Sequence, residues 1–110
     1  MASAFEDRER NYEAKWAHDE DLRFRTVARR NKLLGLWAAD RMGLVGAAAD
    51  SYANALLDLE VRGGRDEDIA RKVREDLEAH RIPMSDHAIH RKMEVLLTEA
   101  AEQVMHEGKS

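Results

Sequence analysis

Residues 85–107 read SDHAIHRKMEVLLTEAAEQVMHE and carry the clearest helical pattern in the chain. Their larger apolar residues recur three and four positions apart, which is the spacing of one face of an α-helix. Ser85 is a favourable N-cap, and Gly108 follows the last apolar position. The stretch therefore predicts an amphipathic helix with one face turned to a core. That face consists of Ile89, Met93, Leu96, Leu97, Ala100 and Val104.

Two shorter blocks with the same periodicity precede this one. The nearer block follows Asp66, which we expect to be its N-cap, and it cannot continue through Pro83. The other block runs over about residues 47–62 and stops at Gly63. The predicted inner faces are Ile69, Val73 and Leu77 in the nearer block, and Tyr52, Leu56 and Leu59 in the other.

The first block runs from about residue 5 to residue 42 and is too long for the rest of the molecule. Gly43 is a suitable left-handed C-cap, and Gly35 is tolerable inside a helix at a cost of about 1 kcal/mol. A continuous helix of this length would measure about 55 Å, whereas a compact domain of the remaining size is about 30 Å across. We expect only its second half to join the core, through Leu33, Leu34, Leu36, Trp37 and Met42.

The composition agrees with an all-helical protein. Ala occurs 17 times and Leu 11 times, whereas Val, Ile and Thr together occur only 11 times in 110 residues. Four helices with short connections predict an all-α, antiparallel four-helix bundle. We assign residues 1–21 to a mobile N-terminal arm and residues 22–110 to the bundle.

Several classes of protein are disfavoured by what the chain contains. The absence of cysteine excludes disulfides, thiolate zinc sites and a cysteine nucleophile. A net charge of -4 argues against a general nucleic-acid binder. No apolar run approaches the length of a membrane span, and we expect a soluble protein without an export signal. No pattern of an active site is present, so we do not expect an enzyme.

The charge is unevenly distributed along the first block. Residues 1–21 hold seven acids and three bases, whereas residues 22–41 hold six bases and one acid. On a helical wheel, Phe5, Tyr12 and Trp16 fall within about 40° of one another. This seam is either incidental in a solvated tail or an anchor that enters a groove of a partner. A membrane-bound helix fits less well, because the stretch is acidic.

Several of these stretches resemble the zeta subunit, the inhibitor of the F-type ATP synthase of alphaproteobacteria. The resemblance runs over nearly the whole chain. The sequence departs from the family pattern at Asn11 and in the aromatic identities of Tyr12 and Trp16. The matching stretches are FEDRER (5–10), YEAKWAHDEDL (12–22), ARRNKLLGLWAA (28–39), DED (66–68), RKVR (71–74), SDH (85–87) and RKME (91–94).

The resemblance implies a four-helix bundle with a mobile inhibitory arm. It implies that the arm enters the catalytic head, built of alpha, beta and gamma subunits, and blocks rotation in the hydrolytic direction. It also implies a cytoplasmic protein that requires no cofactor and whose bundle binds ADP or ATP as a regulatory ligand. The expected contacts of the arm are the anchors Phe5, Tyr12 and Trp16 and the rim charges Arg8, Glu9 and Lys15.

The basic cluster of residues 29–32 is the best place in the sequence for nucleotide phosphates. Arg offers forked donors to phosphate, Lys offers a point charge, and a Trp ring can stack on a base. The alternative is that these bases balance acidic helices and that Trp37 belongs to the core; Arg91 and Lys92 form a second possible cluster. The expected nucleotide-binding residues are Arg29, Arg30, Asn31, Lys32 and Trp37.

Two further hypotheses are open from the sequence. His87 and His90 share a helical face, but two histidines do not make a metal site, and we expect none. A small nucleotide-sensing or helical adaptor module, unrelated to ATPase inhibition, is the alternative to an inhibitor. In that case the bundle would be used and the arm would be idle.

Overall fold

The structure is a computed structural model that describes residues 20–107. It contains helices α2 (Glu20–Arg41), α3 (Ala47–Val61), α4 (Asp66–Ala79) and α5 (Asp86–Glu107), and no strand occurs within residues 20–107. The prediction of an all-α four-helix fold is therefore confirmed. The predicted arm lies outside the described residues up to residue 19, and its last two residues, Glu20 and Asp21, belong to α2.

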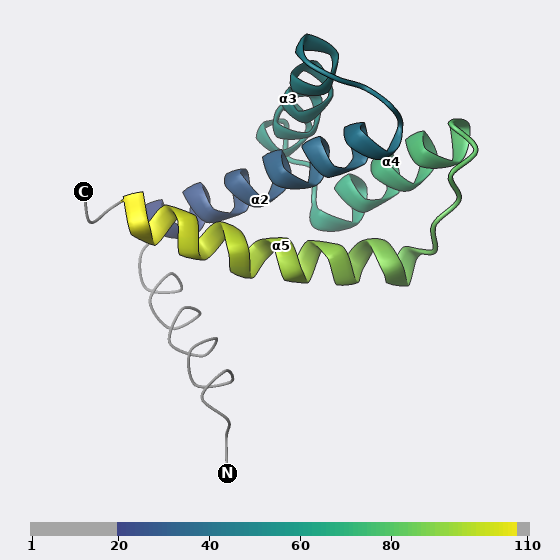
Figure 1. Ribbon diagram of the computed structural model, residues 1–110. Helices are drawn as coiled ribbons and strands as arrows, with labels where there is room; N and C mark the ends of the chain where they lie inside the picture. The colour runs from purple at the N-terminus through teal and green to yellow at the C-terminus, as the bar shows by residue number, and fades with distance from the viewer. Residues whose placement is uncertain (1–19, 108–110) are drawn as a thin grey trace.

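Helix α2 is the centre of the arrangement. It contacts each of the other three described helices, whereas α3 and α5 make no backbone contact with each other. Figure 1 shows α5 running beside α2 in the opposite direction, with α3 on the other side of α2. Helix α4 contacts α5 as well as α2 and α3. One part of the surface of α2 therefore remains uncovered between α3 and α5.

Local sequence explains where the helices end. Gly43 has a φ of 77°, and Leu44 N donates to Ala39 O at 2.8 Å, so the predicted left-handed C-cap of α2 is confirmed. Ala88 N donates to Ser85 Oγ at 3.1 Å, which confirms Ser85 as the N-cap of α5.

The predicted start of α4 is wrong by one residue. Asp66 is the first residue of α4, and the N-cap is Arg65. The side chain that caps this end is Asp68, whose Oδ2 accepts the backbone N–H of Arg65 at 2.9 Å. A carboxylate at the third helical position can satisfy the N-cap backbone in this way, and the sequence offers acids at three successive positions here.

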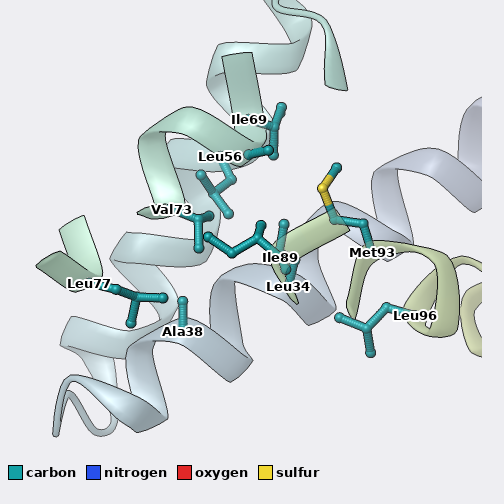
Figure 2. Close-up of a cluster of buried hydrophobic side chains, with 10 residues drawn as sticks. Leu34, Ala38, Leu56, Ile69, Val73, Leu77, Ile89, Met93 and Leu96 are labelled. Atoms are coloured by element: carbon teal, nitrogen blue, oxygen red, sulfur yellow. The ribbon is translucent and has the colours of Figure 1, made fainter. Parts of the chain in front are cut away.

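The core lies where all four helices meet. Figure 2 shows side chains from each helix converging on one cluster. The predicted inner face of α4 is fully confirmed, because Ile69, Val73 and Leu77 are all buried. From the predicted core segment of α2, Leu34 is buried, whereas Leu33, Trp37 and Met42 are only partly buried against the cluster. The cluster consists of Leu34, Ala38, Leu56, Ile69, Ala70, Val73, Leu77, Ile89, Met93 and Leu96.

Helices α2 and α3 approach each other closely at Gly35. A Cβ atom added at Gly35 would lie 2.6 Å from Ala53 Cα, a distance that real Cβ atoms do not reach. A glycine inside a helix is locally unfavourable, but here it lets two backbones pack directly. Its role is therefore to place α3 against α2.

Candidate functional site

The basic stretch of α2 divides between two sides of the helix. Arg29 points to α5, where Nη1 donates to Gln103 Oε1 at 2.8 Å. Its Nη2 pairs with the carboxylate of Glu107 near the end of α5. The Arg29 side chain is only partly exposed, so this pair fastens the N-terminal half of α2 to the C-terminal half of α5.

Arg30 and Asn31 lie on the opposite side, inside the bundle. Arg30 is 3% exposed, and its Nη2 lies 2.7 Å from Asp66 Oδ1 at the start of α4. Its Nε donates to Asn31 Oδ1 at 2.9 Å, and Asn31 Nδ2 donates to Glu60 Oε2 at 2.6 Å. The network links α2 to α3 and α4, and the protein's own groups satisfy both side chains.

Lys32 and Trp37 complete the predicted nucleotide cluster, and they lie apart. Lys32 is exposed on the same side of α2 as Arg29. The Trp37 ring is half-buried between two cations: Arg41 Cζ lies 5.2 Å and Lys92 Nζ 5.5 Å from its centroid. The five predicted residues are therefore not brought together, and Trp37 instead joins Lys92 of the second predicted cluster.

A hollow of about 310 Å³ lies over α2, between α3 and α5. We call it the basic groove. Its lining includes Phe24, Arg25, Arg29 and Lys32 from α2, with Leu57 from α3 and Val104 from α5. Three cations therefore share one wall, and the neighbouring helices contribute the apolar Leu57 and Val104 together with the carboxylate of Glu107, which pairs with Arg29.

Phe24 separates the basic groove from a second hollow of about 330 Å³. That hollow is lined by Glu20, Arg23, Phe24, Val27 and, from α3, Glu60. Phe24 is 62% exposed although it is a large aromatic residue.

Sequence reasoning missed part of this site. Arg25, Arg29 and Lys32 are spaced by four and three residues, which places them on one helical face, and this signal was available in the sequence. The contributions of Leu57 and Val104 were not available, because they depend on how three helices pack.

A second polar network joins α3 to α4. Tyr52 Oη donates to Asp76 Oδ2 at 2.8 Å, and Lys72 Nζ lies 3.1 Å from the same oxygen. Burial of the ring, followed by the hydrogen bond and the charge of Asp76, raises the pKa of the Tyr52 hydroxyl well above its ordinary value near 10. This network holds the bundle together and lies on helices that do not carry the cations of the basic groove.

Within residues 20–107, no group of three or more His, Asp or Glu side chains is placed to hold a metal ion. The site therefore consists of the basic groove, Phe24 and the hollow beside it. The predicted partner contacts Phe5, Arg8, Glu9, Tyr12, Lys15 and Trp16 lie outside the described residues.

Residues 1–103 match a protein family described as ATPase inhibitor subunit zeta. The chain belongs to this family. A protein whose structure was solved in solution by NMR is 35% identical, with a TM-score of 0.67. That similarity covers 78% of this chain and 98% of the other. No curated protein matches the chain.

Membership of the zeta-subunit family confirms the resemblance seen in the sequence. The chain is an inhibitor of the ATP synthase, which it binds as a regulatory protein and not as an enzyme. None of the described helices is both long and apolar enough to cross a membrane.

Proposed function

We propose that the chain inhibits ATP hydrolysis by inserting residues 1 to about 16 into an interface of the catalytic head. One observation carries this proposal: the family match begins at residue 1, so the segment before α2 belongs to the sequence that the family shares. Among the residues that the structure describes, side chains from α2, α3, α4 and α5 form the core cluster.

The physics of such an inhibitor requires selective binding. A wedge stops a cycling head only if it binds one conformation of an interface better than the others. In this proposal Phe5, Tyr12 and Trp16 supply the buried area, about 150–250 Å² each. Arg8 and Lys15, with Glu9, orient the segment at the rim, where charge pairs add little affinity.

Steady-state ATP hydrolysis by the purified catalytic head tests the proposal. The full chain is expected to inhibit saturably, and a chain lacking residues 1–16 is expected not to inhibit. Trp16→Ala should raise the half-inhibitory concentration by roughly tenfold or more, whereas Arg71→Ala, an exposed change on α4, should leave it unchanged. Undiminished inhibition by the truncated chain would show that the arm is not the effector.

We further propose that the bundle binds ADP or ATP, with Arg29 and Lys32 of the predicted cluster on the phosphates. The basic groove supports this placement, because it sets Arg25, Arg29 and Lys32 around one hollow. Phosphate oxygens are good acceptors for such clustered cations. Arg30 and Asn31 would act from behind, by fixing the position of α2 through Asp66 and Glu60. Trp37 with Lys92 is the alternative placement.

Titration of the isotope-labelled protein with Mg-ADP tests this second proposal. Amide shifts around Arg29 and Lys32 are expected, and Lys32→Ala should weaken binding by roughly tenfold. Arg71→Ala is the matched control, since it removes an exposed cation from another helix. Shifts confined to Trp37 and Lys92 would move the site to the second cluster, and shifts that avoid both would contradict the proposal.

The proposed setting is the cytoplasmic side of the membrane-bound synthase, where the catalytic head would meet the arm. Family membership favours this inhibitor function over a nucleotide-sensing or adaptor module, for which an idle arm would be expected.

A further inference from the structure

Phe24 stands out among the exposed side chains of the bundle. Four large apolar residues within residues 20–107 are strongly exposed, namely Phe24, Val45, Val61 and Val95, and Phe24 is the one aromatic. Its side chain lines two hollows of the surface. Aromatic side chains in such settings are typical anchors of protein interfaces.

The position of Phe24 in the chain relates it to the inhibitory arm. Residue 16 is joined to Glu20, the first residue of α2, by four peptide units, which span at most about 14 Å when fully extended. Phe24 lies one helical turn beyond Glu20. If residues 1 to about 16 occupy an interface of the head, the N-terminal end of α2 must therefore lie at the mouth of that interface.

The surroundings of Phe24 define the chemistry of a matching surface. Arg25 and Lys32 lie on one side of it, and Arg23 on the other. Arg25 forms a long pair of 3.9 Å with Asp21, and Lys32 makes no hydrogen bond or ion pair with the residues that the structure describes. An apolar recess with acidic side chains around it would complement this surface.

We infer that Phe24 and the cations beside it form a second docking surface, which binds the catalytic head at the rim of the interface entered by the arm. The inference rests on the proposed insertion of the arm, because the short connection is what brings this surface to the head. The occupant is the ATP synthase itself, and the recess that receives Phe24 is apolar with an acidic rim.

Two anchors on one chain would act together. Once the arm has entered, the second contact becomes intramolecular, with an effective concentration on the order of millimolar for a short connection. A contact too weak to be seen alone can then raise the affinity without changing the inhibited state. Loss of Phe24 should therefore weaken binding and leave full inhibition at saturation.

Inhibition of the catalytic head by full-length variants tests the inference. Phe24→Ala is expected to raise the half-inhibitory concentration about tenfold with unchanged maximal inhibition, and Phe24→Leu should recover part of the loss. Val95→Ala is the matched control, since Val95 is 61% exposed on α5. The half-inhibitory concentration of this variant should stay within about twofold of that of the wild type. Thermal unfolding of each variant checks that the bundle is intact, as expected for substitutions at exposed positions.

Equal inhibition by Phe24→Ala and the wild type would overturn the inference. A wild-type dimer at assay concentration that Phe24→Ala dissociates would also overturn it, because the surface would then bind a second copy. Failure of the arm proposal gives a different result, because the chain lacking residues 1–16 would then still inhibit fully. If only this inference fails, that truncated chain still loses inhibition.

Discussion

Arg29 and Arg30 are neighbours in sequence, but they lie on different sides of α2 and differ in burial. Arg29 is partly exposed at the edge of a hollow, where it bonds to Gln103 and Glu107 of α5. Arg30 is 3% exposed and is held by Asp66 and Asn31. Successive helical residues differ by about 100° in direction, so a run of bases on a helix is not a patch. The side of α2 that carries Arg30 is enclosed by the bundle, whereas the side that carries Arg29 borders a hollow open to solvent.

The largest expected effect tests the buried side. Arg30→Ala should lower the free energy of unfolding by about 2 kcal/mol, because it leaves the buried Asn31 Oδ1 without its donor and removes the bond from Arg30 to the exposed carboxylate of Asp66. The neighbouring Arg29→Ala should cost only about 0.5 kcal/mol, since both Arg29 and its partner Glu107 are partly exposed and water can take over their bonds. Urea denaturation of both variants measures the difference, and equal losses would break the distinction between the two sides.

An intermediate effect is expected at the α3–α4 network. Tyr52→Phe removes a buried hydrogen bond to Asp76 and should lower the free energy of unfolding by about 1 kcal/mol at pH 8. The pKa of Tyr52 is raised in the folded state, so its stabilising effect is complete below the unfolded pKa near 10 and is lost as the pH rises above it. The gap between the two proteins should therefore narrow at pH 11. If the difference in the free energy of unfolding became larger at pH 11, the pKa of Tyr52 would be lowered, not raised, in the folded state.

The smallest expected effect on stability is at Lys32, on the exposed side of α2. Lys32→Ala should change the free energy of unfolding by less than about 0.5 kcal/mol, because Lys32 is exposed and unbonded within residues 20–107. Calorimetry with Mg-ADP on the same sample should show the weakened binding proposed above. A large loss of stability would place Lys32 with the buried side.

Much of the fold follows from local patterns. The spacing of Ile69, Val73 and Leu77 fixes a helical face whatever the rest of the chain does, and all three are buried. Gly43 and Ser85 act at helix ends through their own backbone or hydroxyl group, so their roles are readable from sequence. The start of α4 was less certain to locate, because three successive acids compete to cap it.

The site was less predictable, because it depends on packing between helices. Composition identifies a basic stretch in α2, but the placement of the other three described helices decides that Arg30 is enclosed and that Arg29 borders a hollow. Trp37 illustrates the same limit. A tryptophan near a basic cluster in the sequence predicts a shared site, but its ring lies against Lys92 of α5, a helix far away in the sequence. The exposure of Phe24 was not predictable from the sequence, because a single aromatic residue in a helix is usually part of a core.

The contact at Gly35 has a mechanical consequence for the bundle. Long side chains between two helices can change rotamer under load and let one helix slide, but at Gly35 the nearest atom to an added Cβ would be the backbone Cα of Ala53, at 2.6 Å. Force applied along α2 from its N-terminal end would therefore reach α3 directly. We therefore expect α2 and α3 to move as one body under such a load.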